Sequence, residues 1–161
     1  MASTTRDLTA IEPLLGRDLM LDYTLGGGFF EDADLASGRR PDTGQGVDLQ
    51  VASGLDNLTQ AIANRLKTRK GELAPIGHPD YGSRHHELIG QPNVDRTRNL
   101  IKLYILQALN TEPRIEKVLS VNVVPEHQPP RVSVRVEVQA RVIGQETPLN
   151  LVLPFSLEVA L

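Results

Sequence analysis

The sequence predicts an α+β protein: two main helices packed on a small antiparallel C-terminal sheet, with an irregular N-terminal arm. Apolar residues recur at helical spacing within residues 55–66 and 100–109, whereas the C-terminal third alternates apolar and polar residues as strands do. The beginning of the chain is acidic and rich in glycine and fits neither pattern. We therefore expect an acidic, Gly-rich arm at residues 1–46 and a folded domain at residues 47–161.

The N-terminal arm differs from the rest of the chain in charge. Residues 1–50 carry four Arg and nine Asp or Glu, a net charge of −5, whereas residues 51–161 have a net charge of +2. Three consecutive glycines and a Pro/Gly-rich stretch leave little that could pack continuously, so we expect ordered points only near residues 19–23 and at Phe29 and Phe30. The glycines do not predict a phosphate-binding loop, because no Lys-Ser/Thr pair follows and neighbouring carboxylates would repel a phosphate.

The first long helix is predicted to follow a short strand at residues 47–51. Ser53 and Asp56 have the spacing of a capping box, and Gly71 supplies a stop. The helix has an apolar face made of Leu55, Leu58, Ile62 and Leu66 and a basic end made of Arg65, Lys67, Arg69 and Lys70. Cations are favourable at a helix C-terminus, which explains the basic end; a binding patch is the alternative interpretation.

The second long helix is predicted to begin after Asn93, a good N-cap residue, and to run to about Asn110. Within residues 100–109 only Lys102 and Gln107 are polar. A helix that is apolar around most of its circumference must be covered on more than one side.

Three strands are predicted after this helix, around residues 119–123, 131–142 and 149–159. The connecting loops have the length of hairpin loops, which favours an antiparallel meander packed on the helices. Pro154 cannot donate a ladder hydrogen bond, so it places the third strand at an edge of the sheet or marks a bulge there. An edge strand needs either protection or a companion strand.

Composition excludes several classes of function. The 161-residue chain has no Cys, so it has no thiolate metal site and no cysteine nucleophile. It has no basic run long enough to follow a phosphate backbone, and no stretch approaches the ~20 apolar residues of a membrane span. Its aromatic content of 4% is low for a carbohydrate cleft. We expect a soluble protein made in the cytoplasm that binds no nucleic acid and no cofactor and does not insert directly into a membrane.

Candidate catalytic groups gather between the two helices. His78, His85 and His86 match no zinc motif, and adjacent histidines on a helix point about 100° apart, so we expect no metal site. Ser83, His85 and Asp80 could form a triad, but Ser83 does not lie in a nucleophile elbow. The prolines and glycines of this segment favour a rigid connector, in which Ser83 caps a short helix.

Paired carboxylates for glycoside hydrolysis are a further alternative. The candidates, which would have to lie roughly 5 to 9 Å apart, are Glu72, Asp80, Glu87 and Glu112. A chain with twenty acidic residues offers many accidental pairs, and we predict no catalytic residue.

A charged corner at Glu112, Pro113 and Arg114 ends the second helix. Proline displaces the residue before it from helical geometry, and the helix dipole repels a carboxylate at this end by ~0.3 to 1 kcal/mol. Arg114 offsets that repulsion, and its planar guanidinium is also suited to binding a carboxylate or carbonyl groups of another element. From residue chemistry alone, a surface charge pair and a docking site both remain open.

The order of these motifs resembles a known family. As in the small baseplate wedge subunits of contractile tails, the chain contains in this order RLKTRKGEL, HPDYGS, LI, a helix ending in EPRI and a sheet with alternating valines. That family includes the phage W baseplate protein, the T-even wedge subunit, the type six secretion baseplate E subunit and relatives in extracellular contractile injection systems. The resemblance covers about residues 47–161.

This resemblance implies a structural, non-enzymatic role. It implies a component of a hexameric baseplate in a phage tail-like particle, which joins the wedge core bundle to the first sheath ring and helps to initiate the sheath. The implied partners are the larger wedge proteins, the sheath protein and tube or hub proteins. The residues expected to bind partners are Glu112, Pro113 and Arg114 in the wedge contact, Tyr81 and Gly82 of HPDYGS, and Leu151, Leu153 and Phe155 of the edge strand.

Two other functions stay open at this stage. Some members of the family have carried a lysozyme-like label, so a peptidoglycan hydrolase with paired carboxylates is the alternative from the enzyme class. A homo-oligomeric scaffold unrelated to any tail would fit an exposed strand edge but leaves the charged corner unexplained.

Overall fold

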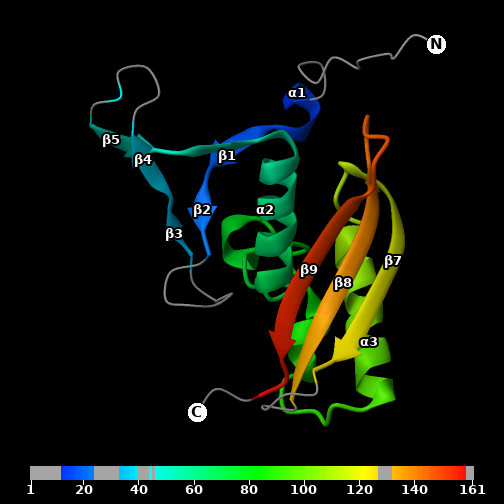
Figure 1. Ribbon diagram of the computed structural model, residues 1–161. Helices are drawn as coiled ribbons and strands as arrows, with labels where there is room; N and C mark the ends of the chain where they lie inside the picture. The colour runs from blue at the N-terminus through cyan, green and yellow to red at the C-terminus, as the bar shows by residue number, and fades with distance from the viewer. Residues whose placement is uncertain (1–11, 24–32, 40–43, 45, 127–131, 159–161) are drawn as a thin grey trace, which may run out of the picture. The chain divides into compact units, whose positions relative to one another are not determined.

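The two long helices and the three-stranded antiparallel sheet predicted from the sequence are present in the computed structural model (Figure 1). It describes residues 12–23, 33–39, 44, 46–126 and 132–158. The expected ordered points at Phe29 and Phe30 and the three consecutive glycines lie outside these residues. The chain divides into two units, residues 1–61 and 62–161.

The second unit contains the sheet and most of the core. Its elements are the C-terminal part of α2 (Gly54–Lys67), η2 (Ala74–Ile76), η3 (Arg84–Leu88), α3 (Asp95–Leu109), β7 (Ile115–Pro125), β8 (Ser133–Val142) and β9 (Leu149–Ser156). The strand order is β7-β8-β9 and both pairings are antiparallel, which confirms the predicted meander. α3 packs against β7 and η3.

The core of this unit follows the two periodicities of the sequence. On β8 alternate residues are buried: Val134, Val136, Val138, Ala140 and Val142. On α3 the buried apolar residues are Ile101, Ile105, Ala108 and Leu109. The expected cover of α3 comes from β7 and η3, but it does not reach the whole circumference, because Leu103 is 46% exposed. Burial of each large aliphatic side chain stabilises the fold by about 1.5 to 3 kcal/mol before entropy is counted.

Three local predictions differ from the structure. The N-cap of α3 is Val94 and not Asn93, whose side chain and carbonyl instead accept hydrogen bonds from Arg98. The short helix after Ser83 is a 3₁₀ helix, and the Ser83 hydroxyl does not cap it but pairs with His85. β7 is longer than predicted and contains two register shifts, which interrupt the alternation that defines a strand in sequence.

The first unit is a junction of three two-stranded ribbons beside the start of α2. Its elements are α1 (Glu12–Leu15), β1 (Arg17–Leu19), β2 (Leu21–Asp22), β3 (Asp34–Leu35), β4 (Ser37–Arg39), β5 (Val47–Leu49) and β6 (Val51–Ser53). The antiparallel pairs are β1 with β6, β2 with β3, and β4 with β5. The single strand predicted at residues 47–51 is thus two strands, β5 and β6, with Gln50 between them. β5 pairs with β4, and β6 pairs with β1.

Two amides of α2 hold this junction. The Gln60 side chain accepts a hydrogen bond from the Leu21 N–H and donates one to the Leu19 carbonyl, both at 2.8 Å. The Asn57 amide donates to the Leu15 carbonyl at 2.9 Å. Both side chains are buried, so these contacts satisfy polar groups that would otherwise be costly to bury.

Candidate functional site

The predicted corner after α3 is a tight turn with a buried carboxylate. The N–H of Glu112 donates to the Leu109 carbonyl at 3.1 Å, and the N–H of Ile115 donates to the Glu112 carbonyl at 3.0 Å, so the chain leaves the helix and enters β7 within a few residues. Glu112 is only 4% exposed, whereas Pro113 lies at the surface. The surface charge pair considered from the sequence is therefore not what the chain forms.

Two arginines hold the Glu112 carboxylate. Arg114 Nε lies 2.6 Å from Oε1, and Arg65 Nη2 from α2 lies 3.4 Å from Oε2. Arg65 Nη1 also donates to Thr111 Oγ1 at 3.0 Å. Burial by itself would raise the pKa of Glu112, but the hydrogen bonds and charge of Arg114, with the charge of Arg65, outweigh it and lower that pKa.

Tyr81 packs the HPDYGS loop against the same cluster. The Arg65 guanidinium lies 4.6 Å from the centre of the Tyr81 ring, which is the geometry of a cation–π contact. Burial raises the pKa of Tyr81. The positive charges of Arg65 and Arg114 oppose this rise, whereas the negative charge of Glu112 adds to it. The structure thus brings together three of the eight residues predicted to bind partners, Tyr81, Glu112 and Arg114, around Arg65.

Gly82 allows the loop to approach α2 closely. Its φ is +97°, and a Cβ at this position would lie 2.6 Å from the Arg69 carbonyl oxygen. The neighbouring backbone is paired, because the Ser83 N–H donates to the Thr68 carbonyl and the Lys70 N–H donates to the Ser83 carbonyl. Only glycine fits both the conformation and the space.

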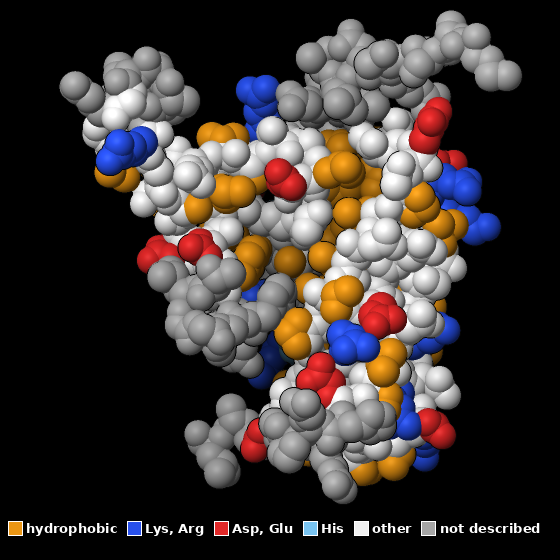
Figure 2. All heavy atoms as spheres, viewed as in Figure 1, with side chains coloured by type: hydrophobic (Ala, Val, Ile, Leu, Met, Phe, Trp, Pro, Cys, Tyr) orange, Lys and Arg blue, Asp and Glu red, His pale blue; other side chains and the backbone are white. Residues whose placement is uncertain are grey.

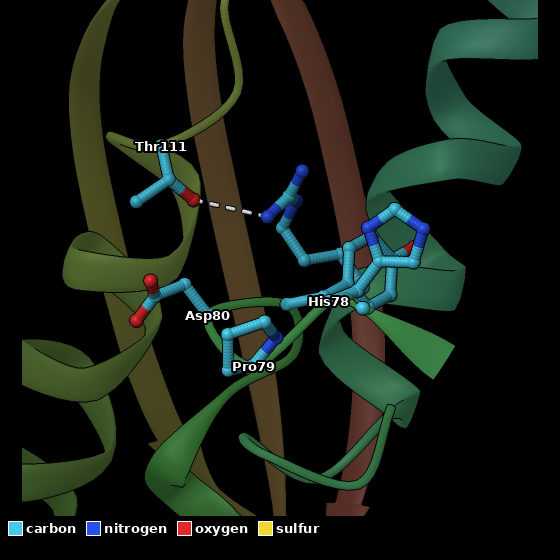
Figure 3. Close-up of a pocket in the computed structure, with 7 residues that line it drawn as sticks. His78, Pro79, Asp80 and Thr111 are labelled. Carbon is cyan, nitrogen blue, oxygen red and sulfur yellow. Dashed lines mark hydrogen bonds between the residues drawn. The ribbon is translucent and has the colours of Figure 1, made fainter. Parts of the chain in front are cut away.

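An open hollow of about 330 Å³ lies beside the corner. It is lined by Arg65, Gly77, His78, Pro79, Asp80, Tyr81 and Thr111. Figure 3 shows the loop with His78, Pro79 and Asp80 facing the turn that carries Thr111. The exposed Asp80 also pairs with Lys70 at 3.6 Å. The hollow offers hydrogen-bonding and charged groups next to a rigid turn, which suits a protein contact.

The predicted edge strand β9 is indeed at an edge of the sheet. Leu157 N–H donates to Val132 across the ladder, and alternate residues of an antiparallel strand point their N–H groups toward and away from the partner. The backbone nitrogens of Asn150, Val152 and Pro154 therefore point to the outer edge of the sheet. Because Pro154 has its nitrogen on that side, its missing N–H removes no hydrogen bond to β8.

A proline at the same end of each edge strand, β7 and β9, limits the addition of further strands to the sheet. The Glu126 N–H donates to the Ser133 carbonyl of β8, so the nitrogen of the preceding Pro125 points away from β8, to the outer edge of β7. Pro125 pairs with Val134 and Pro154 with Arg135, so the two prolines flank adjacent residues of β8. A further strand could pair with β9 only over the Asn150–Val152 half.

The three β9 side chains predicted to bind partners lie on the core side of the sheet. Leu151, Leu153 and Phe155 pair with the buried valines of β8, and Leu153 is 6% exposed. Phe155 packs edge-on against the His85 ring at 4.5 Å. A partner strand would therefore meet the backbone of β9 and the exposed Val152.

Ser83 and His85, two residues of the triad considered above, are hydrogen-bonded at 2.8 Å but buried. Burial and then the neighbouring His86 lower the pKa of His85 to about 3. Asp80 is 89% exposed and pairs with Lys70, so it does not complete a triad. A serine that is 1% exposed cannot meet a bulky substrate.

The four carboxylates considered for glycoside hydrolysis are held by other groups. Glu87 pairs with Arg84 at 2.9 Å, Glu72 accepts the Arg69 N–H at 2.9 Å, and Asp80 and Glu112 pair as described. Among the described residues, no His, Asp and Glu side chains group as a metal site requires. None of the described helices has the length and apolar character of a membrane span.

Arg65 lies in the last turn of α2, as predicted, but its contact with the charged corner was not foreseen from the sequence. Its side chain is only 12% exposed, and it joins α2 to the corner by pairing with Glu112. Its position three residues after the buried Ile62 was an available signal, because residues three apart share a helix face. Thr111, which accepts its hydrogen bond, carried no such signal.

Comparison with known proteins identifies the family of this chain. The family model for baseplate wedge protein gp25 matches residues 52–147. The chain belongs to this family. That span includes Arg65, the HPDYGS loop and the charged corner, and the assignment carries a structural role in a baseplate.

Two solved structures are similar. A proposed tail lysozyme from Geobacter sulfurreducens is 29% identical, with 66% of this chain and 94% of that chain covered and a TM-score of 0.57. A chain of the baseplate complex from the type VI secretion system is 21% identical, with 62% and 89% covered and a TM-score of 0.49. No curated protein matches the chain significantly.

Proposed function

We propose that the chain is a structural wedge subunit of a contractile, phage tail-like particle, where its charged corner docks on larger wedge proteins. The observation that carries this proposal is the buried Glu112, held by Arg65 and Arg114, which fixes the exposed Pro113 and the partly exposed Arg114 in one orientation. A pre-ordered surface binds with a smaller entropic cost than a mobile one. The hollow beside the corner adds polar groups to the same surface.

We propose further that β9 receives a strand from the sheath protein, so that the chain joins the wedge to the first sheath ring and helps to initiate sheath assembly. Strand addition uses main-chain hydrogen bonds, which the Asn150–Val152 half of β9 can provide. The prolines at the other end restrict the register in which a strand could add. The same proposal includes a hexameric arrangement, contacts with tube or hub proteins, and assembly in the bacterial cytoplasm. It also divides the chain into an arm at residues 1–46 and a wedge domain at residues 47–161.

Co-purification tests the wedge contact. Arg114→Ala should leave a folded chain but reduce its recovery with the larger wedge proteins at least tenfold, because the corner loses both a guanidinium and a support for Glu112. Arg84→Ala is the matched control: Arg84 is exposed and pairs with Glu87 outside the corner, so recovery should not change. Equal recovery of both variants would rule out the proposed contact.

A hydrolase function is the second candidate, because the Geobacter sulfurreducens structure is described as a proposed tail lysozyme. A general acid in glycoside hydrolysis needs a raised pKa, whereas the pKa of Glu112 is lowered. We expect no clearing of peptidoglycan by the purified chain. Robust clearing that is lost in Glu112→Gln or Glu72→Gln would favour the enzyme instead.

A further inference from the structure

The hollow beside the charged corner is lined by hydrogen-bond donors whose acceptors are missing from the described part of the chain. A guanidinium offers five N–H donors. Arg65 uses one on Thr111 and one on Glu112, and its buried Nε has no acceptor among the described residues. The hydroxyl of Tyr81, which lines the same hollow, makes no hydrogen bond to any described residue. Such unsatisfied groups in a fold require an explanation.

The exposed face of the sheet is different, because its polar side chains pair with one another. Arg135 donates to Glu137 at 3.0 Å, and the Gln139 amide donates to the Asn150 side chain at 3.1 Å. Figure 2 shows acidic and basic side chains next to each other over β8 and β9. Polar groups that are already paired gain little from a partner protein, whereas the donors of the hollow gain new hydrogen bonds.

The charge around the hollow favours an anionic group. Arg65 and Arg114 share the single carboxylate of Glu112, and Lys70 pairs with Asp80 at 3.6 Å. These three cations and two carboxylates leave an excess of one positive charge. The carboxylate that lines the hollow, Asp80, is 89% exposed, so solvent screens its repulsion of a second anion.

The volume and the donors of the hollow fit the carboxylate of a side chain. The hollow of about 330 Å³ is much larger than the roughly 30 Å³ that one water molecule occupies in the liquid. Burial raises the pKa of Tyr81, so its hydroxyl keeps its proton at neutral pH and can donate. An ionised carboxylate only accepts hydrogen bonds, and its two oxygens can accept from a guanidinium and a hydroxyl together.

We infer that the hollow binds the carboxylate of an Asp or Glu side chain from a larger wedge protein, with the Arg65 guanidinium and the Tyr81 hydroxyl as its donors. The inference rests on the proposed function, which supplies the partner. It adds a defined chemistry to the docking surface, because the Tyr81 hydroxyl provides a hydrogen bond that the described fold does not use.

Removal of the Tyr81 hydroxyl tests this site. Tyr81→Phe keeps the ring and its cation–π contact with Arg65 but removes the donor. Because the hydroxyl bonds to no described residue, the denaturation midpoint should not change, whereas recovery with the larger wedge proteins should fall about tenfold. Tyr104→Phe is the matched control: its ring lies 4.7 Å from the Arg84 guanidinium and does not line the hollow, so recovery should not change.

Photocrosslinking in assembled wedge complexes identifies the group in the hollow. The full chain carries p-benzoylphenylalanine in place of His78, which lines the hollow, or in place of Leu103 of α3, which does not. We expect the probe at position 78, but not at 103, to crosslink a segment of a larger wedge protein that contains Asp or Glu. Exchange of that acid for its amide should lower recovery of the unmodified chain about tenfold, and recovery of Tyr81→Phe by less, because both changes remove one interaction.

The inference is overturned by equal recovery of Tyr81→Phe and Tyr104→Phe, by the absence of a crosslink from position 78, or by a crosslink only to a segment without Asp or Glu. Independent losses from Tyr81→Phe and from the exchange in the partner would also overturn it. Arg114→Ala separates the two proposals. Full recovery of Arg114→Ala refutes the proposed wedge contact, whereas its loss together with unchanged recovery of Tyr81→Phe refutes only the carboxylate site.

Discussion

The two units of the chain reach order by different means. In residues 62–161, buried aliphatic side chains of α3 and β8 form a continuous core, and a buried ion cluster fixes one corner of it. In the described part of residues 12–61, strands of two or three residues have few buried apolar side chains. They are held by the Asn57 and Gln60 amides of α2 and by a ring of backbone hydrogen bonds between Met20, Ala36 and Gln50. A core gives global stability, whereas a hydrogen-bonded junction gives a defined local geometry that opens more easily.

The largest expected effect is at Gly82 in the second unit. Gly82→Ala should lower the free energy of unfolding by about 4 kcal/mol, because a left-handed backbone costs a non-glycine residue about 1 to 2 kcal/mol and the clash with the Arg69 carbonyl forces the loop away from α2. Gly77→Ala is the control, since φ is +93° but the space around its Cβ is open, and it should cost only about 1 to 2 kcal/mol. Chemical denaturation measures both; equal losses would show that the loop does not need this approach.

Glu112→Gln should cause the second-largest loss in the free energy of unfolding. It leaves Arg65 and Arg114 facing a neutral amide in a largely buried cluster, and loss of one partner of a buried pair costs about 3 kcal/mol. Glu137→Gln removes the partner of Arg135 in an exposed pair on the sheet and should cost less than about 1 kcal/mol. Similar denaturation midpoints for the two variants would mean that the corner is not a stabilising element.

Acid should destabilise the second unit through His85. The pKa of His85 falls from 6.5 in the unfolded chain to about 3 in the fold, so the folded state binds fewer protons between these values. Stability is complete above pH 6.5 and decreases as the pH falls below it, by up to about 1.4 kcal/mol per pH unit. Comparison of unfolding at pH 7 and pH 5 should show a smaller difference in His85→Gln, which keeps an amide near Ser83 but does not titrate. The same pH dependence in the variant would contradict this assignment.

The smallest expected effect on global stability is in the first unit. Gln60→Met leaves the Leu21 N–H and the Leu19 carbonyl without the side-chain partners seen here, at a cost of roughly 1 to 3 kcal/mol to the local structure. Hydrogen exchange should speed up at the junction residues Met20, Ala36 and Gln50 and stay unchanged along β8. A uniform change through both units would show that they do not differ as described.

The sequence by itself determined the elements whose pattern is long and regular. The apolar positions of α2 and α3 and the alternating valines of β8 repeat often enough to identify a helix or strand, and Pro154 correctly predicted the edge position of β9. The resemblance over residues 47–161 led to the family that the match at residues 52–147 then showed. These features are visible because each depends on local spacing along the chain.

Only the tertiary structure decided which distant residues meet. Arg65 and Glu112 are 47 residues apart, and nothing in their spacing shows that a basic helix end neutralises a buried carboxylate. Met20, Ala36 and Gln50 are separated by unequal lengths of chain, and only the folded chain shows that their N–H and carbonyl groups close a ring of hydrogen bonds. Long-range pairing is set by packing and backbone hydrogen bonding in three dimensions, which a one-dimensional pattern does not record.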